Sequence, residues 1–274
     1  MTGDVPVVTP AWLSLREPAD AAARAPELAA LVRRHLAAGP QAMIHDLGCG
    51  SGSMGRWLAP RLPGPQHWIL YDRDPGLLER ARAGMVDTAA DGAPVTVETR
   101  RCDITRLTAD DLADARLVTA SALLDMLTVE EVERVVTACA GAGCPTLLTL
   151  SVTGEVEIMP PDPLDAALAE AFNAHQRRTT AGRTLLGPDA VAATVDAYQR
   201  RGTGVLIRSS PWRLGTGQAE LISEWLDGWL AAACDQRPEL RRAVAPYRRR
   251  RRAAAVADRL EVVVHHRDLL TGCQ

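Results

Sequence analysis

Three glycines at alternate positions, preceded by an acidic residue, form the string Asp46-Leu47-Gly48-Cys49-Gly50-Ser51-Gly52. Glycine lets the backbone approach a ligand closely, and the short run 42–47 leads into the string as a strand would. A helical pattern starts near Ser53, so free backbone N–H groups and the positive end of that helix would face the same crevice. The spacing predicts a ligand-binding turn between a strand and a helix, although a structural turn with a capping acid would use the same residues.

The glycines alone leave two kinds of ligand open. Gly50, Gly52 and Gly55 fit the G-x-G-x-x-G of a dinucleotide turn, so a nicotinamide dehydrogenase must be weighed. Asp46 suits a ligand that carries an ammonium group, and it is badly placed for a pyrophosphate. Short-chain dehydrogenases use a Tyr-x-x-x-Lys pair, and this chain contains no Lys.

Two further acids end the next two expected strands. Asp72 ends the run 67–72, where it could accept hydrogen bonds from vicinal ribose hydroxyls. Asp103 follows the run 95–101, where a carboxylate can accept from an adenine amino group. Either residue could instead only form a turn. Taken with the glycines, the two acids favour a cofactor site.

These motifs, in this order, resemble those of the class I S-adenosylmethionine-dependent methyltransferases over roughly residues 26–152. The resemblance implies S-adenosylmethionine as the cofactor, with Asp72 at its ribose, Arg73 along its adenine and Asp103 at the adenine amino group. It also implies that the segment 120–125 passes under the methionine moiety. The expected cofactor-binding residues are Asp46, Gly48, Cys49, Gly50, Gly52, Asp72, Arg73, Cys102, Asp103, Ile104 and Ser121.

The methyl group on a sulfonium is already activated, so the protein has to hold a nucleophile in line with the sulfur–carbon bond in a site poor in water. A hydroxyl or ammonium nucleophile also needs a base, for which Asp125 and His175 are the candidates. Asp125 could instead be a first-turn acid of the expected helix 128–140, and His175 could lie on a solvated helix face. Glu155 and Glu157 alternate with apolar residues as on a strand, and we expect a solvated face there.

The N-terminal segment contains Trp12, Arg16 and Arg24. It could fold over the cofactor as a lid, with Arg16 or Arg24 reaching the methionine carboxylate. Simple packing of this segment against the helix layer is the alternative that we favour.

The elements that must position these residues alternate between strand and helix up to residue 152, which predicts a doubly wound α/β fold with a mostly parallel sheet. Further helices are expected after the fifth strand and between the last two. The seven expected strands are 42–47, 67–72, 95–101, 116–121, 145–152, 204–209 and 260–266. The expected helices are 26–38, 53–62, 75–84, 128–140, 162–178 and 188–201, with one or two in 217–257 broken near Pro238.

We expect a single domain of four consecutive parts. These are an N-terminal helical lid (1–40), a cofactor-binding core (41–152), a helical insert for the acceptor (153–202), and C-terminal strands and helices (203–274).

All 31 cationic side chains are Arg. The lack of Lys excludes Schiff-base and pyridoxal-phosphate enzymes, P-loop proteins and protein kinases. The six cysteines form no CxxC pair and have no His at zinc-ligand spacing, which indicates reduced thiols and no metal. The first twenty residues do not read as a signal peptide, and no apolar run is long enough to span a membrane, so we expect a soluble, cytoplasmic protein.

The expected activity is methyl transfer from S-adenosylmethionine to an oxygen or nitrogen of a small-molecule acceptor. One alternative is an RNA methyltransferase that grips phosphate with the run Arg248–Arg252, and another is a catalytically inactive cofactor-binding protein. We expect the arginine run to be a solvated helix face, because the net charge is −3 and Tyr247 is its only aromatic neighbour. Nucleic acid and membrane are therefore not expected as partners.

Overall fold

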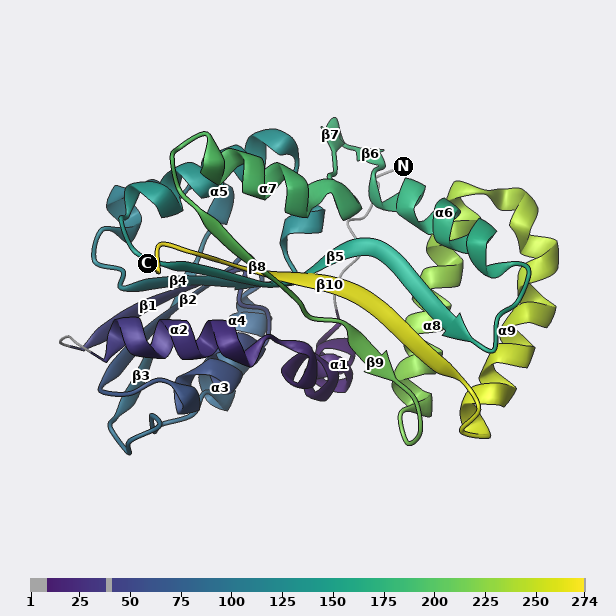
Figure 1. The fold of residues 1–274 in the computed structure, drawn as a ribbon, viewed down its shortest axis with the longest axis horizontal. Coiled ribbons are helices and arrows are strands. Elements are labelled where there is room, and N and C mark those ends of the chain that lie inside the picture. The colour runs from purple at the N-terminus through teal and green to yellow at the C-terminus, as the bar shows by residue number, and fades with distance from the viewer. Residues whose placement is uncertain (1–8, 38–40, 274) are drawn as a thin grey trace.

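A computed structural model describes residues 9–37 and 41–273. Residues 1–8 and 38–40, which belong to the predicted lid, lie outside the described residues. One sheet has the strand order β3-β2-β1-β4-β5-β10-β8, with β9 paired to β10 (Figure 1). Its strands are β1 (Ala42–Leu47), β2 (Gln66–Asp72), β3 (Val95–Arg101), β4 (Leu117–Ser121), β5 (Thr146–Met159), β8 (Val205–Ser209), β9 (Trp212–Leu214) and β10 (Glu261–Thr271).

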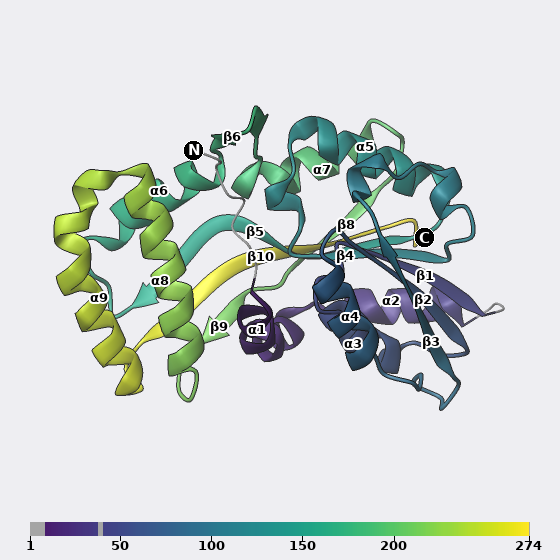
Figure 2. The ribbon, with the colours of Figure 1, turned by 180° about the vertical axis from the view of Figure 1, so that it is seen from behind.

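Helices cover both faces of the sheet. Figures 1 and 2 show α2, α3 and α4 on one face, α5 and α7 on the other, and α6, α8 and α9 gathered at one end of the molecule. The helices are α1 (Pro10–Ala23), α2 (Pro26–Leu36), α3 (Ser53–Leu58), α4 (Pro75–Gly84), α5 (Val129–Gly141), α6 (Asp165–Gln176), α7 (Ala190–Gln199), α8 (Ala219–Gln236) and α9 (Arg241–Val256). In the part of the chain that the structure describes, no helix is long and apolar enough to cross a membrane.

The first five strands are mutually parallel, and β10 runs antiparallel to β5 and β8. This arrangement confirms the predicted doubly wound, mostly parallel fold. All seven predicted strands are present, and the three-residue β9 adds an eighth. The carboxyl ends of β1, β2 and β4 lie at the same edge, where open α/β sheets bind ligands.

Local sequence explains where the helices begin. Asp74 accepts from the backbone N–H groups of Gly76 and Leu77 and so caps α4, which starts at Pro75. Thr128 and Glu131 form the predicted capping box at the start of α5. The structure also confirms the break near Pro238, since α8 ends at Gln236 and α9 begins at Arg241.

The fifth and last strands are longer than predicted. The structure extends β5 to Met159 rather than to residue 152, and it extends β10 to Thr271 rather than to residue 266. Beyond the core, residues 153–159 of β5 and the first residues of β10 form an antiparallel ribbon, to which β9 pairs at Val262–Val264 and which α6, α8 and α9 cover (Figure 1). The position 152/153, where we place a boundary between core and insert, therefore lies within β5.

The predicted solvated face at Arg248–Arg252 is confirmed for Arg249, Arg250 and Arg252, which are exposed, but it is wrong for Arg251. Arg251 is buried and bonds to both carboxylate oxygens of Asp165 at 2.6 and 2.7 Å. Arg250 pairs with Asp162, and Arg248 and Arg252 both pair with Asp227. The run consequently joins α9 to α8 and to the start of α6.

Candidate functional site

The glycine turn connects β1 to α3 as predicted. Gly48 and Gly52 have φ angles of +63° and +85°, which other residues rarely adopt. A Cβ at Gly48 would lie 3.0 Å from Cδ1 of Leu123, and one at Gly52 would lie 3.1 Å from Cα of Ala81. The turn therefore requires glycine at both positions. Within it, burial raises the pKa of the Cys49 thiol, which keeps the thiol protonated.

Asp46 ends β1 as a buried acid with one unused oxygen. Its Oδ1 accepts a hydrogen bond of 2.7 Å from the hydroxyl of Thr119 on β4, whereas its buried Oδ2 has no partner. Burial raises the pKa of Asp46 to about 7, against the bond from Thr119 and the positive charge of Arg24. A cationic group beside this carboxyl would therefore stabilise its ionised form.

Arg24, at the end of α1, is a buried cation with unused donors. It is 2% exposed, and its guanidinium lies 5.4 Å from the centre of the Trp57 ring. Its Nη2 donates to the hydroxyls of Ser53 and Ser121, both at 3.1 Å, but its Nε and Nη1 have no partner. Arg24 and Asp46 influence each other's pKa, yet no ion pair between these two described residues forms.

The two later acids already accept hydrogen bonds. Asp72 accepts from the backbone N–H of Gly50 at 2.9 Å and from that of Asp74 at 3.0 Å. Asp103 pairs with Arg73 at 2.7 Å and accepts from the hydroxyl and N–H of Thr105. These bonds outweigh its partial burial and lower the pKa of Asp103 to about 2.

The structure thus gathers the predicted cofactor residues at one sheet edge. Asp72 reaches the glycine turn directly through Gly50, and Arg73 and Asp103 join the ends of β2 and β3. Cys102 is half-buried and Ile104 is buried beside Asp103. Ser121 lies at the end of β4, where its Oγ accepts from both Arg24 and the hydroxyl of Thr149.

Helix α1 lies over the glycine turn. The Cδ1 atom of Leu13 is 3.5 Å from where a Cβ at Gly50 would be, and Glu17 pairs with Arg56 of α3 through two hydrogen bonds of 2.6 and 2.7 Å. The covering helix is therefore fixed to the far side of the turn.

Arg16, the other cation that we considered for the cofactor, is already neutralised. Both of its bonds go to Asp20, at 2.9 and 3.1 Å, and its guanidinium lies over the ring of Trp212. Trp12 packs against the same Trp212, with their ring centroids 6.3 Å apart. The packing alternative that we favoured accounts for Trp12 and Arg16, but it does not account for Arg24.

The two candidate bases, Asp125 and His175, lie on different elements. Asp125 lies half-buried in the 3₁₀ turn η4 (Leu124–Met126), and burial raises its pKa to about 6. His175 is half-buried near the end of α6, and burial lowers its pKa. The positive charge of Arg178 lowers the pKa of both groups, so each of them lies within electrostatic reach of Arg178.

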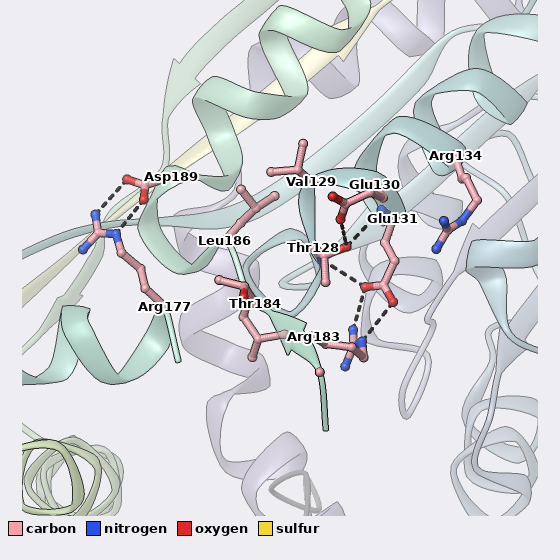
Figure 3. A pocket seen from close by; sticks show the side chains of 12 residues that line it. Thr128, Val129, Glu130, Glu131, Arg134, Arg177, Arg183, Thr184, Leu186 and Asp189 are labelled. Carbon is pink, nitrogen blue, oxygen red and sulfur yellow. Dashed lines mark hydrogen bonds and ion pairs between the residues drawn. The ribbon is translucent and has the colours of Figure 1, made fainter. Parts of the chain in front are cut away.

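A cavity of about 540 Å³ lies between the start of α5 and the segment 182–189 (Figure 3). Its charged side chains are largely paired with each other. Arg183 pairs with Glu131 and Arg177 pairs with Asp189 at opposite ends of the cavity. No predicted cofactor residue lines it.

One family of known proteins matches the part of the chain that forms this sheet edge. Residues 44–145 match the family model described as a methyltransferase domain, a range that contains the glycine turn, Asp72, Asp103 and Ser121. Over these residues the chain is similar to a methyltransferase domain. The match supports a methyltransferase activity.

Several solved structures match this chain at low sequence identity. The YcgJ protein from Bacillus subtilis is 11% identical, with a TM-score of 0.47, and the match covers 90% of this chain and 97% of that one. A methyltransferase from Geobacter sulfurreducens in complex with S-adenosyl-L-homocysteine is 16% identical, with a TM-score of 0.43 and coverage of 96% and 98%. The cyclopropane synthase MmaA2 from Mycobacterium tuberculosis is 10% identical, with a TM-score of 0.46 and coverage of 90% and 83%. No curated protein matches.

Sequence reasoning missed Asp268, a residue that supports the methyltransferase site. Asp268 is fully buried in β10 and accepts at 2.8 Å from the N–H of Ala25 and, through its other oxygen, at 2.8 Å from that of Leu150. The first bond fixes the chain next to Arg24, and the second holds Leu150 at a φ of +58°. An acid just after the last predicted strand, directly before Leu269 and Leu270, was the available signal.

Proposed function

We propose that Arg24 and Asp46 bind the amino-acid end of S-adenosylmethionine, and that the enzyme transfers the methyl group to an oxygen or nitrogen of a small molecule by in-line displacement. The observation that carries this proposal is the pair of buried, opposite charges with unused atoms. A carboxylate would satisfy Nε and Nη1 of Arg24, and an ammonium would satisfy Oδ2 of Asp46.

The energetic argument is that unsatisfied buried groups are costly. Leaving one buried donor or acceptor unpaired costs about 1–3 kcal/mol, and more when the group is charged. A zwitterion between Arg24 and Asp46 would remove both penalties at once. A pyrophosphate would satisfy Arg24 but would repel Asp46, which argues against a dinucleotide.

The other predicted contacts complete the cofactor site. We assign the ribose to Asp72, and the adenine to the space beside the Arg73–Asp103 pair, flanked by Cys102 and Ile104. The turn from Gly48 to Gly52 would approach the cofactor with its backbone. Because Asp103 already has strong partners, we expect its contact with the adenine amino group to be one bond among several.

The bound cofactor supplies the activated methyl group, and the chain supplies positioning and proton removal. Helix α1 would exclude water from the cofactor. Asp125, whose pKa is about 6, would be mostly ionised at neutral pH and could accept the proton of a hydroxyl or amine. His175 is the second candidate base. We further propose that residues 1–40 act as the lid and 153–202 as the acceptor insert.

The RNA alternative loses its main support in the fold. Four of the five arginines in the run Arg248–Arg252 pair with acids of α8, or of α6 and the turn before it. Intramolecular acids therefore compete with phosphate for these four cations, and one of them, Arg251, is buried. A small-molecule acceptor remains the better proposal.

Transfer of labelled methyl groups tests this proposal. The protein is incubated with methyl-labelled S-adenosylmethionine and either a pool of small hydroxyl and amine compounds or total RNA. We expect label in the small-molecule pool only, at least 100-fold less with Asp125→Asn and unchanged with the exposed control Glu155→Gln. Label in RNA would contradict the proposal, and binding of S-adenosylhomocysteine without any transfer would favour an inactive cofactor-binding protein.

A further inference from the structure

Two adjacent arginines at the end of α6 differ sharply in their surroundings. Arg177 is exposed and pairs with Asp189 through two bonds of 2.6 and 2.7 Å (Figure 3). Arg178 is half-buried, and its Nη1 donates to the backbone oxygen of His175 at 3.1 Å. Arg178 forms no ion pair with any carboxylate in the described ranges 9–37 and 41–273. One cation is thus neutralised and its neighbour is not.

The backbone of Arg178 is fixed at both of its polar groups. Its N–H donates to the oxygen of His175 at 3.1 Å, and its own oxygen accepts from Leu185 at 3.2 Å. The second bond closes the base of the hairpin formed by β6 (Thr179–Thr180) and β7 (Arg183–Thr184). The bond from Nη1 to His175 also restrains the guanidinium, which lowers the conformational freedom that it loses when it binds a ligand.

The hairpin itself is anchored beside Asp125. Arg183 donates to both carboxylate oxygens of Glu131, at 2.9 and 2.6 Å, and to the backbone oxygen of Met126 at 3.0 Å (Figure 3). Met126 directly follows Asp125 in the turn η4. Arg183 therefore ties the hairpin that begins next to Arg178 to the element that carries the proposed base.

Other charged groups near this region do not neutralise Arg178. Arg16 also acts on Asp125, but it is held by Asp20. Asp235 acts on His175 from α8. Asp125 itself attracts Arg178 without reaching ion-pair distance. The capping of α6 by Arg178 occupies Nη1, which leaves the other donors of a planar fork suited to carboxylate or phosphate.

We propose that Arg178 binds an anionic group, a carboxylate or a phosphate, on the methyl acceptor and so places the acceptor beside Asp125. The inference rests on the proposed function, because it concerns the acceptor side of the same site. Arg178 would be a specificity-determining residue rather than a proton carrier.

Ligand-observed NMR on protein saturated with S-adenosylhomocysteine tests the inference. The probes are benzoate, phenyl phosphate and the neutral benzyl alcohol, and the variants are Arg178→Gln, Arg178→Lys and the adjacent control Arg177→Gln. At least one of the two anions should bind more tightly than benzyl alcohol, and Arg178→Gln should weaken that binding at least tenfold. Arg178→Lys should restore part of it, Arg177→Gln should leave it unchanged, and which anion binds better distinguishes carboxylate from phosphate.

The inference fails if neither anion binds better than the alcohol, or if Arg177→Gln weakens anion binding as much as Arg178→Gln. The affinity of each variant for S-adenosylhomocysteine is measured first by calorimetry. Failure of the unmodified protein to bind S-adenosylhomocysteine would contradict the proposed function itself, whereas intact binding without anion preference would contradict only the role of Arg178.

Discussion

Arg24 and Asp46 are a pair of buried charges that approach each other without forming an ion pair. Most buried charges in proteins are paired, because an isolated one loses its hydration. Here the atoms without partners are donors on Arg24 and an acceptor on Asp46. A ligand with a carboxylate and an ammonium on one carbon fits that arrangement.

Arg24→Gln should weaken binding of the amino-acid end of the cofactor without affecting binding of its nucleoside end. Loss of the guanidinium should weaken S-adenosylhomocysteine binding by at least tenfold, about 1.4 kcal/mol, because a charge-assisted contact to the carboxylate is lost. Adenosine, which lacks the amino-acid end, should bind with unchanged affinity. Calorimetry measures both, with Arg61→Gln as the control, since Arg61 also lies over the Trp57 ring but is exposed. Equal weakening of adenosine would contradict the assignment.

Asp46 should make cofactor binding depend on pH. Its folded pKa of about 7 lies above the ordinary 3.8, so the stability that this group contributes is present below about pH 4 and is lost as the pH rises through 7. An ammonium ligand favours the ionised form, so binding should weaken by up to tenfold per unit as the pH falls from 7 to 5. Titrations of S-adenosylhomocysteine over this range should show that slope, and Asp46→Asn should abolish it. A flat profile in the unmodified protein would count against the contact.

At the scale of elements, α1 connects cofactor burial to the rest of the fold. The pair between Glu17 and Arg56 holds it across the glycine turn, with both side chains partly exposed. Glu17→Gln should therefore raise the dissociation rate of S-adenosylhomocysteine about threefold, which corresponds to the modest energy of a partly exposed ion pair. Stopped-flow displacement measures the rate. Glu27→Gln, which removes an exposed acid on α2, is the control and should leave the rate unchanged.

The helices and strands show how much of the fold can be predicted from the sequence. The strands 42–47 and 95–101 and the helix 75–84 are confirmed at their predicted bounds. Proline begins this helix and glycine ends it. The extension of β5 beyond residue 152 was left out of the predicted strand, because Gly154 interrupts the apolar run, although Glu155 and Glu157 alternate with apolar residues as on a strand. The choice between Arg16 and Arg24 depends on which side of α1 faces the sheet, and that is set by bonds such as Asp268 to Ala25 that join distant parts of the chain.

At the scale of the whole molecule, the arginine run connects α9 to α8 and to the start of α6. Asp165→Asn should lower the free energy of unfolding by about 3 kcal/mol, because it leaves the buried guanidinium of Arg251 without its carboxylate partner. Arg249→Gln, at a position with no ion pair among the described residues, should change it by less than about 0.5 kcal/mol. Denaturant unfolding measures both values. Equal changes in the free energy of unfolding for the two variants would contradict a stabilising pair between Arg251 and Asp165.

The central claim is that the sheet edge binds S-adenosylmethionine through both ends of its amino-acid moiety. Calorimetric titration of the protein with S-adenosylhomocysteine, with NAD as the comparison ligand, tests it most directly. We predict binding of the thioether at micromolar concentration and no binding of NAD. Binding of NAD in place of S-adenosylhomocysteine would contradict the claim and would identify the glycine turn as a dinucleotide site.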